Sequence, residues 1–228
     1  MNPESPTADS GEPPLADVLA AHGFELPSEQ ITRLDRYREL LWSWNEKLNL
    51  TRHTTLEKFV TRDVLDSSEL AKLLGKRERV LDVGTGGGVP GVVLAILRPD
   101  LRVSLCESTG KKARAVEAIV QDMGLKVPVF HTRAEEVLEV RTFDSLVVRA
   151  VAPLAKLLKW FTGSWKAFDQ ILIIKGRSWP DERGEARHLG LMRNLDLRVA
   201  AKYRTPDTGA ENVILRIAPK GKLDLEEA

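Results

Sequence analysis

The sequence predicts an α/β protein built on a mainly parallel sheet of seven strands with helices on its faces. The first observation is the apolar run 80–83, followed by a glycine-dense turn, 84–91, and an apolar helix-compatible run, 92–97. A strand, a turn with little side-chain bulk and a helix start form the ligand-binding corner of an open α/β sheet. The second is that apolar strands alternate with helical segments from Arg79 onward, which predicts parallel strands with right-handed crossovers.

The segments before the sheet are expected to be a tail and a set of helices. Residues 1–14 hold four prolines and no Lys or Arg, which predicts a disordered tail. Residues 15–78 are expected to form a helical extension packed on the core, with a short first helix over 15–22. The second helix is expected from an N-cap at Ser28 to about Asn49, and the third from a capping box of Thr54 and Glu57 to Gly75.

The sheet domain is expected over residues 79–219. Five parallel strands are predicted at 80–83, 102–107, 127–132, 143–149 and 171–175. Helices are predicted between them, after the glycine turn and at 111–123, 134–138 and 153–161, with a polar helix at 181–194. The segments 197–204 and 212–217 resemble a closing antiparallel pair, and residues 220–228 a frayed tail.

Composition restricts the classes of function. A chain of 228 residues, 43% of them hydrophobic, suffices for one domain with a substantial core. The net charge of +1 means that any nucleic-acid surface must be local. One cysteine and four scattered histidines provide neither a disulfide framework nor metal-ligand spacing. Without a signal peptide or a membrane-length apolar run, we expect a cytoplasmic protein with no metal.

Acidic residues around the glycine turn bear on which cofactor it holds. Residues 86–91 satisfy the G-x-G-x-x-G pattern of a nicotinamide dinucleotide site, which alone is weakly specific. S-adenosylmethionine is favoured because Asp82, two residues before Gly84, can anchor the turn and sit near a methionine amino group but would repel a pyrophosphate. Glu107, at the end of the second strand, can accept hydrogen bonds from both ribose hydroxyls of adenosine, which both cofactors contain.

Short motifs on both sides of the turn resemble those of one known family. They are W-N-x-x-x-N-L-T at 44–51, the end of R-H-x-L-D-S at 65–67, V-G-T-G-x-G-x-P-G at 83–91, [DE]-S-x-x-K-[KR] at 107–112, R-A-x-A at 149–152 and K-G at 175–176. On these motifs the chain is identified as a member of the glucose-inhibited division protein B family over roughly residues 28–218. In two departures, Asp63 stands for the histidine of the second motif and Gly87 for a proline of the glycine loop.

The resemblance implies a function and a set of site residues. Members are Rossmann-like class I S-adenosylmethionine-dependent methyltransferases, also called methyltransferase G, that modify guanine N7 in 16S ribosomal RNA of the small subunit. It implies two catalytic residues, Arg149 and Lys175, at the carboxyl ends of the fourth and fifth strands, with Arg149 contacting donor or substrate and Lys175 facing the RNA. The cofactor-binding residues are expected to be Asp82, Gly84, Gly86, Val89, Glu107, Ala134, Glu135 and Arg149.

Methyl transfer to guanine N7, the reaction that the resemblance implies, does not require a catalytic triad, and the sequence shows no evident one. Guanine N7 carries an accessible lone pair, so positioning and electrostatics suffice and no general base is required. Local basic clusters near 111–114, 156–159 and 175–187 provide candidate phosphate contacts, and we expect a monomer. The alternatives are a small-molecule methyltransferase, a dinucleotide-dependent dehydrogenase, and a non-catalytic RNA-binding ribosome assembly factor.

Overall fold

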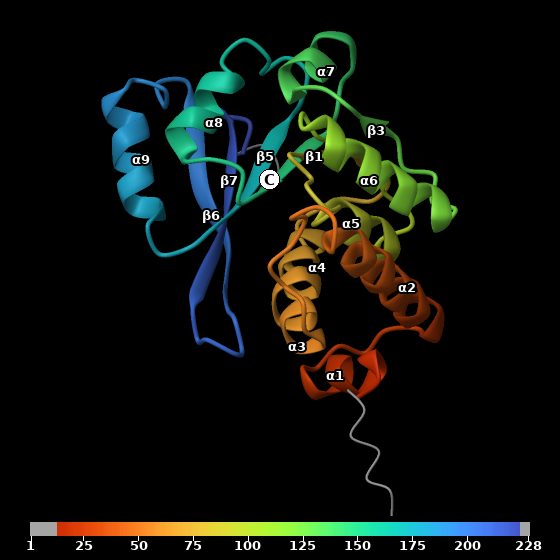
Figure 1. Cartoon of the computed structure of the whole chain (residues 1–228). Helices are drawn as coiled ribbons and strands as arrows, with labels where there is room; N and C mark the ends of the chain where they lie inside the picture. Colours follow the sequence, from red (N-terminus) through yellow and green to blue (C-terminus); the bar gives the residue numbers. More distant parts are fainter. Residues whose placement is uncertain (1–12, 224–228) are drawn as a thin grey trace, which may run out of the picture.

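One seven-stranded sheet forms the centre of the molecule in the computed structural model, which describes residues 13–223 (Figure 1). The strand order is β3-β2-β1-β4-β5-β7-β6. Strands β1 to β5 are parallel, and β7 runs antiparallel to both β5 and β6, as the sequence predicted. The strands are β1 Arg79–Val83, β2 Arg102–Cys106, β3 Val129–Phe130, β4 Ser145–Arg149, β5 Gln170–Lys175, β6 Leu195–Arg204 and β7 Glu211–Pro219.

Helices cover both faces of the sheet, so the inner strands are apolar on both sides. Along β1, Val80 belongs to one hydrophobic core and Leu81 and Val83 to the other, following the alternation of side chains in a strand. The first core includes the N-terminal helices, α5 and α6; the second includes α7, α8 and α9 (Figure 1). The helices after β1 are α5 Gly91–Leu97, α6 Gly110–Asp122, α7 Ala134–Val140, α8 Leu154–Trp160 and α9 Trp179–His188.

The N-terminal helices differ from the predicted boundaries. Helix α1 is Leu15–Ala21, and α2 is Ser28–Asn45, ending four residues before the predicted Asn49. Pro27, not Ser28, holds the N-cap position of α2, and Ser28 already has helical geometry. For the third helix the N-cap is Thr55, whose hydroxyl accepts from the Lys58 amide, so the predicted capping box at Thr54 was wrong by one residue.

The third N-terminal helix is also not a uniform α-helix. It consists of α3 Leu56–Lys58, a π-helical segment η1 Phe59–Val64, and α4 Leu65–Ala71. π-Helical turns are rare and occur frequently at functional sites, because they widen the helix and redirect its side chains. Apolar periodicity shows no such widening, so the sequence predicted a continuous helix here.

Other boundaries shift by one to six residues. Strand β3 is confined to two residues of the predicted 127–132, and α9 ends at His188 rather than at 194. The predicted disordered tail lies outside the described residues up to residue 12, as does the frayed C-terminus from residue 224. Within residues 13–223, no helix is long and apolar enough to cross a membrane.

Candidate active site

The glycine turn after β1 brings bare main chain to the carboxyl end of the sheet. Gly84 has φ +69°, a conformation that L side chains rarely adopt. A Cβ at Gly84 would lie 2.8 Å from Cγ2 of Val151, which follows β4, so a side chain has no room there. The turn therefore needs glycine for both its conformation and its close packing against the β4 end.

Asp82 anchors this turn from within β1. Its Oδ2 accepts hydrogen bonds from the Thr85 hydroxyl at 2.6 Å and the Gly91 amide at 2.8 Å. Burial raises the pKa of Asp82 to about 6, against the opposing effect of these two hydrogen bonds. Its Oδ1 is buried and has no partner among the described residues. The predicted anchoring is thus present, while a direct contact of Asp82 with a bound ligand stays a prediction.

Glu107 follows β2 and ties two loops together. Its Oε2 accepts from the Gly86 amide at 3.1 Å, and its Oε1 accepts from the Thr109 amide at 2.7 Å. A carboxylate offers about four lone-pair positions, so both oxygens retain capacity for ribose hydroxyls. The side chain is nearly buried, which fixes its orientation beside the glycine turn. Its role in ribose binding stays a prediction.

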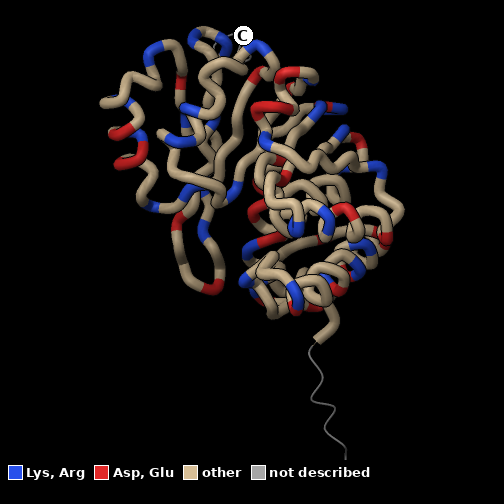
Figure 2. Tube along the Cα trace, turned by 45° about the horizontal axis from the view of Figure 1, so that its top comes forward, with Lys and Arg blue, Asp and Glu red and all other residues tan. Residues whose placement is uncertain are grey.

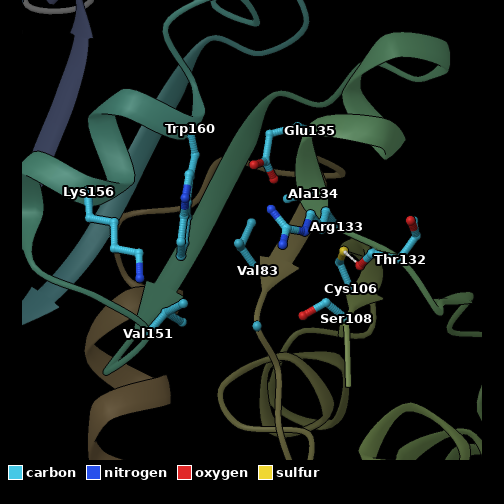
Figure 3. A pocket seen from close by; sticks show the side chains of 11 residues that line it. Val83, Cys106, Ser108, Thr132, Arg133, Ala134, Glu135, Val151, Lys156 and Trp160 are labelled. Atoms are coloured by element: carbon cyan, nitrogen blue, oxygen red, sulfur yellow. Dashed lines mark hydrogen bonds between the residues drawn. The ribbon is translucent and has the colours of Figure 1, made fainter. Parts of the chain in front are cut away.

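Two cavities share Gly84 in their linings, and between them they contain all the predicted cofactor residues except Asp82 and Glu107. Figure 3 shows the larger of the two. The larger holds about 220 Å³ and contains Ala134 and Glu135. The smaller holds about 150 Å³ and contains Gly86, Val89 and Arg149. The larger is lined by Val83, Gly84, Cys106, Ser108, Thr132, Arg133, Ala134, Glu135, Val151, Lys156 and Trp160. The smaller is lined by Leu41, Leu50, Thr51, Gly84, Thr85, Gly86, Gly87, Val89, Arg149 and Ala150.

The larger cavity contains a tryptophan side chain, Trp160, that sequence reasoning missed. Trp160 reaches it from α8, opposite Arg133 and Glu135 from the start of α7 (Figure 3). Lys156 lies one helical turn before Trp160, with its Nζ 5.5 Å from the indole ring. The sequence signal that could have located Trp160 is its spacing of four residues from Lys156, which places both side chains on one face of α8. This flat apolar wall suits a purine ring.

Cys106 also faces the larger cavity, but as a thiol. Its Sγ donates to the Thr132 carbonyl at 3.0 Å. Burial, reinforced by the negative charge of Glu107, raises the pKa of Cys106 to about 12. The thiolate is the nucleophilic form of cysteine, so Cys106 is not poised for covalent chemistry.

Arg149, the last residue of β4, lies in the smaller cavity within a buried ion-pair cluster. Its Nη1 lies 2.7 Å from Oδ1 of Asp63 and 3.2 Å from Oδ2 of Asp66. Burial opposes the guanidinium charge, but these two carboxylates outweigh it and raise the pKa of Arg149. The next residue, Ala150, has φ +54°, an uncommon value for a residue with a side chain. The strand end is thus held in a strained conformation beside the cavity.

The tryptophan–asparagine motif fixes the opposite wall of the smaller cavity. The Asn45 side-chain oxygen accepts from the Leu50 and Thr51 amides at 2.8 and 2.9 Å. Tyr37 donates to the Gly87 carbonyl at 3.0 Å from a fully buried position on α2. Helix α2 and the residue at its end therefore hold both the loop at 50–51 and the glycine turn. These contacts connect the motif at 44–51 with the motif at 83–91.

Lys175, the second predicted catalytic residue, is engaged in a structural contact. Its Nζ donates to the Ala152 carbonyl at 2.8 Å and pairs with Glu182 of α9 at 2.7 Å. Glu182 also accepts from the Leu154 amide at 2.7 Å, so this pair joins β5, α8 and α9. The Lys175 side chain is only 12% exposed, and an RNA contact for it stays a prediction.

The seven-stranded sheet, with β7 antiparallel between β5 and β6, has the fold of class I S-adenosylmethionine-dependent methyltransferases. Solved structures of this fold include a Bacillus cereus O-methyltransferase in complex with S-adenosylhomocysteine (TM-score 0.60, 18% identity, covering 89% of this chain and 96% of that one). The 23S rRNA methyltransferase ErmE is a more distant match (TM-score 0.51, 15% identity, covering 70% of this chain and 69% of that one).

The particular family follows from sequence. A family model described as rRNA small subunit methyltransferase G matches residues 30–204, and the chain belongs to this family. The Rhodopirellula baltica protein of that name is 48% identical over 186 residues, covering 82% of this chain and 80% of the relative. The Mycobacterium marinum protein of that name is 39% identical over 203 residues, covering 85% and 86%. The family predicted from the motifs is confirmed.

Proposed function

We propose that this protein transfers a methyl group from S-adenosylmethionine to N7 of one guanine in 16S ribosomal RNA of the small subunit. The observation that carries the proposal is the pair of cavities meeting at Gly84 in a chain of this family. One ligand lying across Gly84 places adenine against Ala134, Glu135 and Trp160, and its amino-acid end beside Arg149. The negative charge of Asp82, buried beside the glycine turn, suits a ligand with a cationic end.

The residues of the chain supply binding and orientation. Bound S-adenosylmethionine supplies a methyl group on a positively charged sulfur. Glu107 and the wall of Trp160 orient the adenosine part, and the glycine turn allows close approach of the main chain. Guanine N7 needs no proton removed, so no side chain in the site has to act as a base. Holding the two reactants in line, in the preorganised electrostatic environment of the site, provides the rate enhancement.

RNA contacts are proposed at exposed basic side chains around the carboxyl edge of the sheet. Lys111 and Arg114 lie on the first turns of α6, Lys159 on α8, and Arg177 after β5. None of these four is in an ion pair among residues 13–223, so each is free to approach a phosphate. Basic and acidic segments alternate over the rest of the chain, in keeping with the net charge of +1 (Figure 2).

Calorimetric titration tests the donor site, with S-adenosylhomocysteine and NAD as separate ligands. We expect binding of the first and none of the second. In Gly84→Ala, the added Cβ meets Val151 in a left-handed conformation, and we expect binding to be lost. Gly163→Ala is the matched control, because no described atom lies within 4 Å of its Cβ position. Absence of binding in the wild type would reject the proposal.

Methyl transfer from labelled donor to small ribosomal subunits and to bare 16S RNA tests the reaction. We expect label in RNA from one or both substrates, and loss of label in Arg149→Ala. Label incorporated by Arg149→Ala at the wild-type rate would remove Arg149 from the catalytic residues. No label in either RNA, from protein that binds S-adenosylhomocysteine, would reject the substrate while leaving the donor site intact.

A further inference from the structure

In the ion-pair cluster around Arg149, two buried carboxylates contact one guanidinium. Asp63 from η1 and Asp66 from α4 are both buried, and both accept from the same atom, Nη1 of Arg149. Removing a carboxylate from water costs several kcal/mol unless its partners compensate. Yet Oδ2 of Asp63 is buried without a partner among the described residues. One carboxylate would be enough to balance the charge of Arg149. The second carboxylate therefore indicates that the pair also fixes the orientation of the guanidinium.

Four separate segments converge on this cluster. His53, in the loop before α3, brings Nδ1 within 2.7 Å of Oδ1 of Asp63. Tyr203, on β6, donates its hydroxyl to Oδ1 of Asp66 at 2.6 Å. The π-helical segment η1 carries Asp63 three residues before Asp66, and both reach Arg149 at the end of β4. The N-terminal helices and the terminal hairpin thus act on one side chain of the cavity.

The contacts leave one edge of Arg149 available. Both carboxylates use Nη1, and among residues 13–223 neither Nε nor Nη2 has a hydrogen-bond partner. Arg149 itself lines the smaller cavity together with the glycine turn and Thr51. A planar guanidinium with two parallel N–H donors matches the two oxygens of a carboxylate. A carboxylate therefore fits this edge better than a single carbonyl oxygen does.

We propose that Asp63 is a positioning residue that, with Asp66, holds Arg149 so that its free edge binds the carboxylate of the donor's methionine part. This rests on the donor site proposed above. It also gives a role to Asp63, the position at which the chain departs from the family motif. A histidine from the neighbouring loop, His53, contacts Asp63 at 2.7 Å.

Two ligands that differ only in the amino-acid part test the proposal. S-adenosylhomocysteine carries the carboxylate, and 5′-methylthioadenosine keeps the adenosine and sulfur but lacks it. In Asp63→Asn we expect the dissociation constant of S-adenosylhomocysteine to rise about tenfold or more, as for loss of a charge-assisted contact. Binding of 5′-methylthioadenosine is expected to change less than twofold. Retained binding of that ligand also shows that the variant is folded.

Asp144→Asn is the matched control, since Asp144 pairs with Arg79 at the opposite end of β1, at 2.7 Å. We expect neither ligand to bind more weakly in that variant. If Asp63→Asn does not fold, Asp66→Asn carries the same expectation, because Asp66 contacts the same nitrogen.

Equal weakening of both ligands, or of neither, would overturn the proposal. An unchanged affinity for S-adenosylhomocysteine with a raised KM for RNA would also overturn it and place the free edge of Arg149 against the acceptor base. Failure of the wild type to bind either ligand would instead reject the proposed function, so the two failures are distinguishable.

Discussion

Replacing Asp82 by asparagine measures what the buried carboxylate costs the fold. Burial raises its pKa from the ordinary value of 3.8 to about 6. The native protein therefore holds this proton up to a higher pH than the unfolded chain does. Between about pH 4 and pH 6 the native state binds more protons, so the stability of the wild type falls as the pH rises through this window. The asparagine variant lacks this dependence.

The difference between the native and the unfolded pKa of Asp82 sets the expected change in the free energy of unfolding. At about 1.4 kcal/mol for each tenfold change in proton affinity, ionised Asp82 lowers the free energy of unfolding by about 3 kcal/mol at neutral pH. About 2 kcal/mol of this is regained at about pH 4.5, where the native carboxyl is protonated and the unfolded one is largely ionised. The contacts to Thr85 and Gly91 can be kept by the asparagine oxygen.

Urea unfolding of both proteins at about pH 7.5 and about pH 4.5 checks this. The difference in free energy of unfolding is expected to move by about 2 kcal/mol in favour of the wild type on acidification. Asp144→Asn is the control of opposite sign, because its hydrogen bond with Arg79 lowers the pKa of Asp144. The stability that Asp144 contributes is present at neutral pH and is lost in acid. A wild-type advantage over Asp82→Asn that does not vary with pH would refute the reasoning.

Three further substitutions test the packing of the site. In Gly91→Ala the new Cβ would lie 2.2 Å from Cδ2 of Leu105, and we expect urea unfolding to show a loss of about 1–3 kcal/mol; an unchanged midpoint would contradict this contact. Trp160→Ala is expected to weaken S-adenosylhomocysteine binding about tenfold by calorimetry, through loss of the aromatic wall, whereas unchanged affinity would place adenine elsewhere. Despite its partial burial, Glu182 has a lowered pKa through its contacts with Lys175 and Leu154, so the stability that it contributes is lost progressively as the pH falls below the ordinary value of 4.5. Glu182→Gln is therefore expected to lower the melting temperature most at neutral pH and progressively less below about pH 4.5; a loss that does not vary with pH would argue against the ion pair.

The sheet was predictable because its signals are local. Apolar runs of strand length, separated by helical periodicity, gave all seven strands and the antiparallel pair. The glycine turn was predictable because its conformations require glycine. Helix boundaries were predicted less accurately where either of two adjacent residues could occupy the N-cap position. The observed N-caps are Thr55 and Pro27, whereas Thr54 and Ser28 were predicted. Such choices between adjacent residues depend on packing that periodicity does not record.

The ion-pair cluster was not predictable from the sequence. Its members are Asp63, Asp66, Arg149 and Tyr203. Asp66 and Tyr203 alone are 137 residues apart, and all four come together only in the folded sheet. Asp63 was visible only as a departure from a motif, and His53 had no feature that marked it as a partner. The same applies to Trp160, whose position on α8 facing the cavity depends on how that helix crosses the sheet. Motifs predicted which residues bind, and tertiary contacts determine how those residues are held.

Mapping the modified base is the most direct test of the central claim. Small subunits treated with the protein and S-adenosylmethionine would be probed by strand scission that is specific for 7-methylguanosine, and the cut position read by primer extension. We predict one new scission site, at a guanine of 16S RNA, that is absent without donor and in Arg149→Ala. Methyl label in the RNA without such scission would contradict transfer to N7, and scission at many guanines would contradict a single specific acceptor.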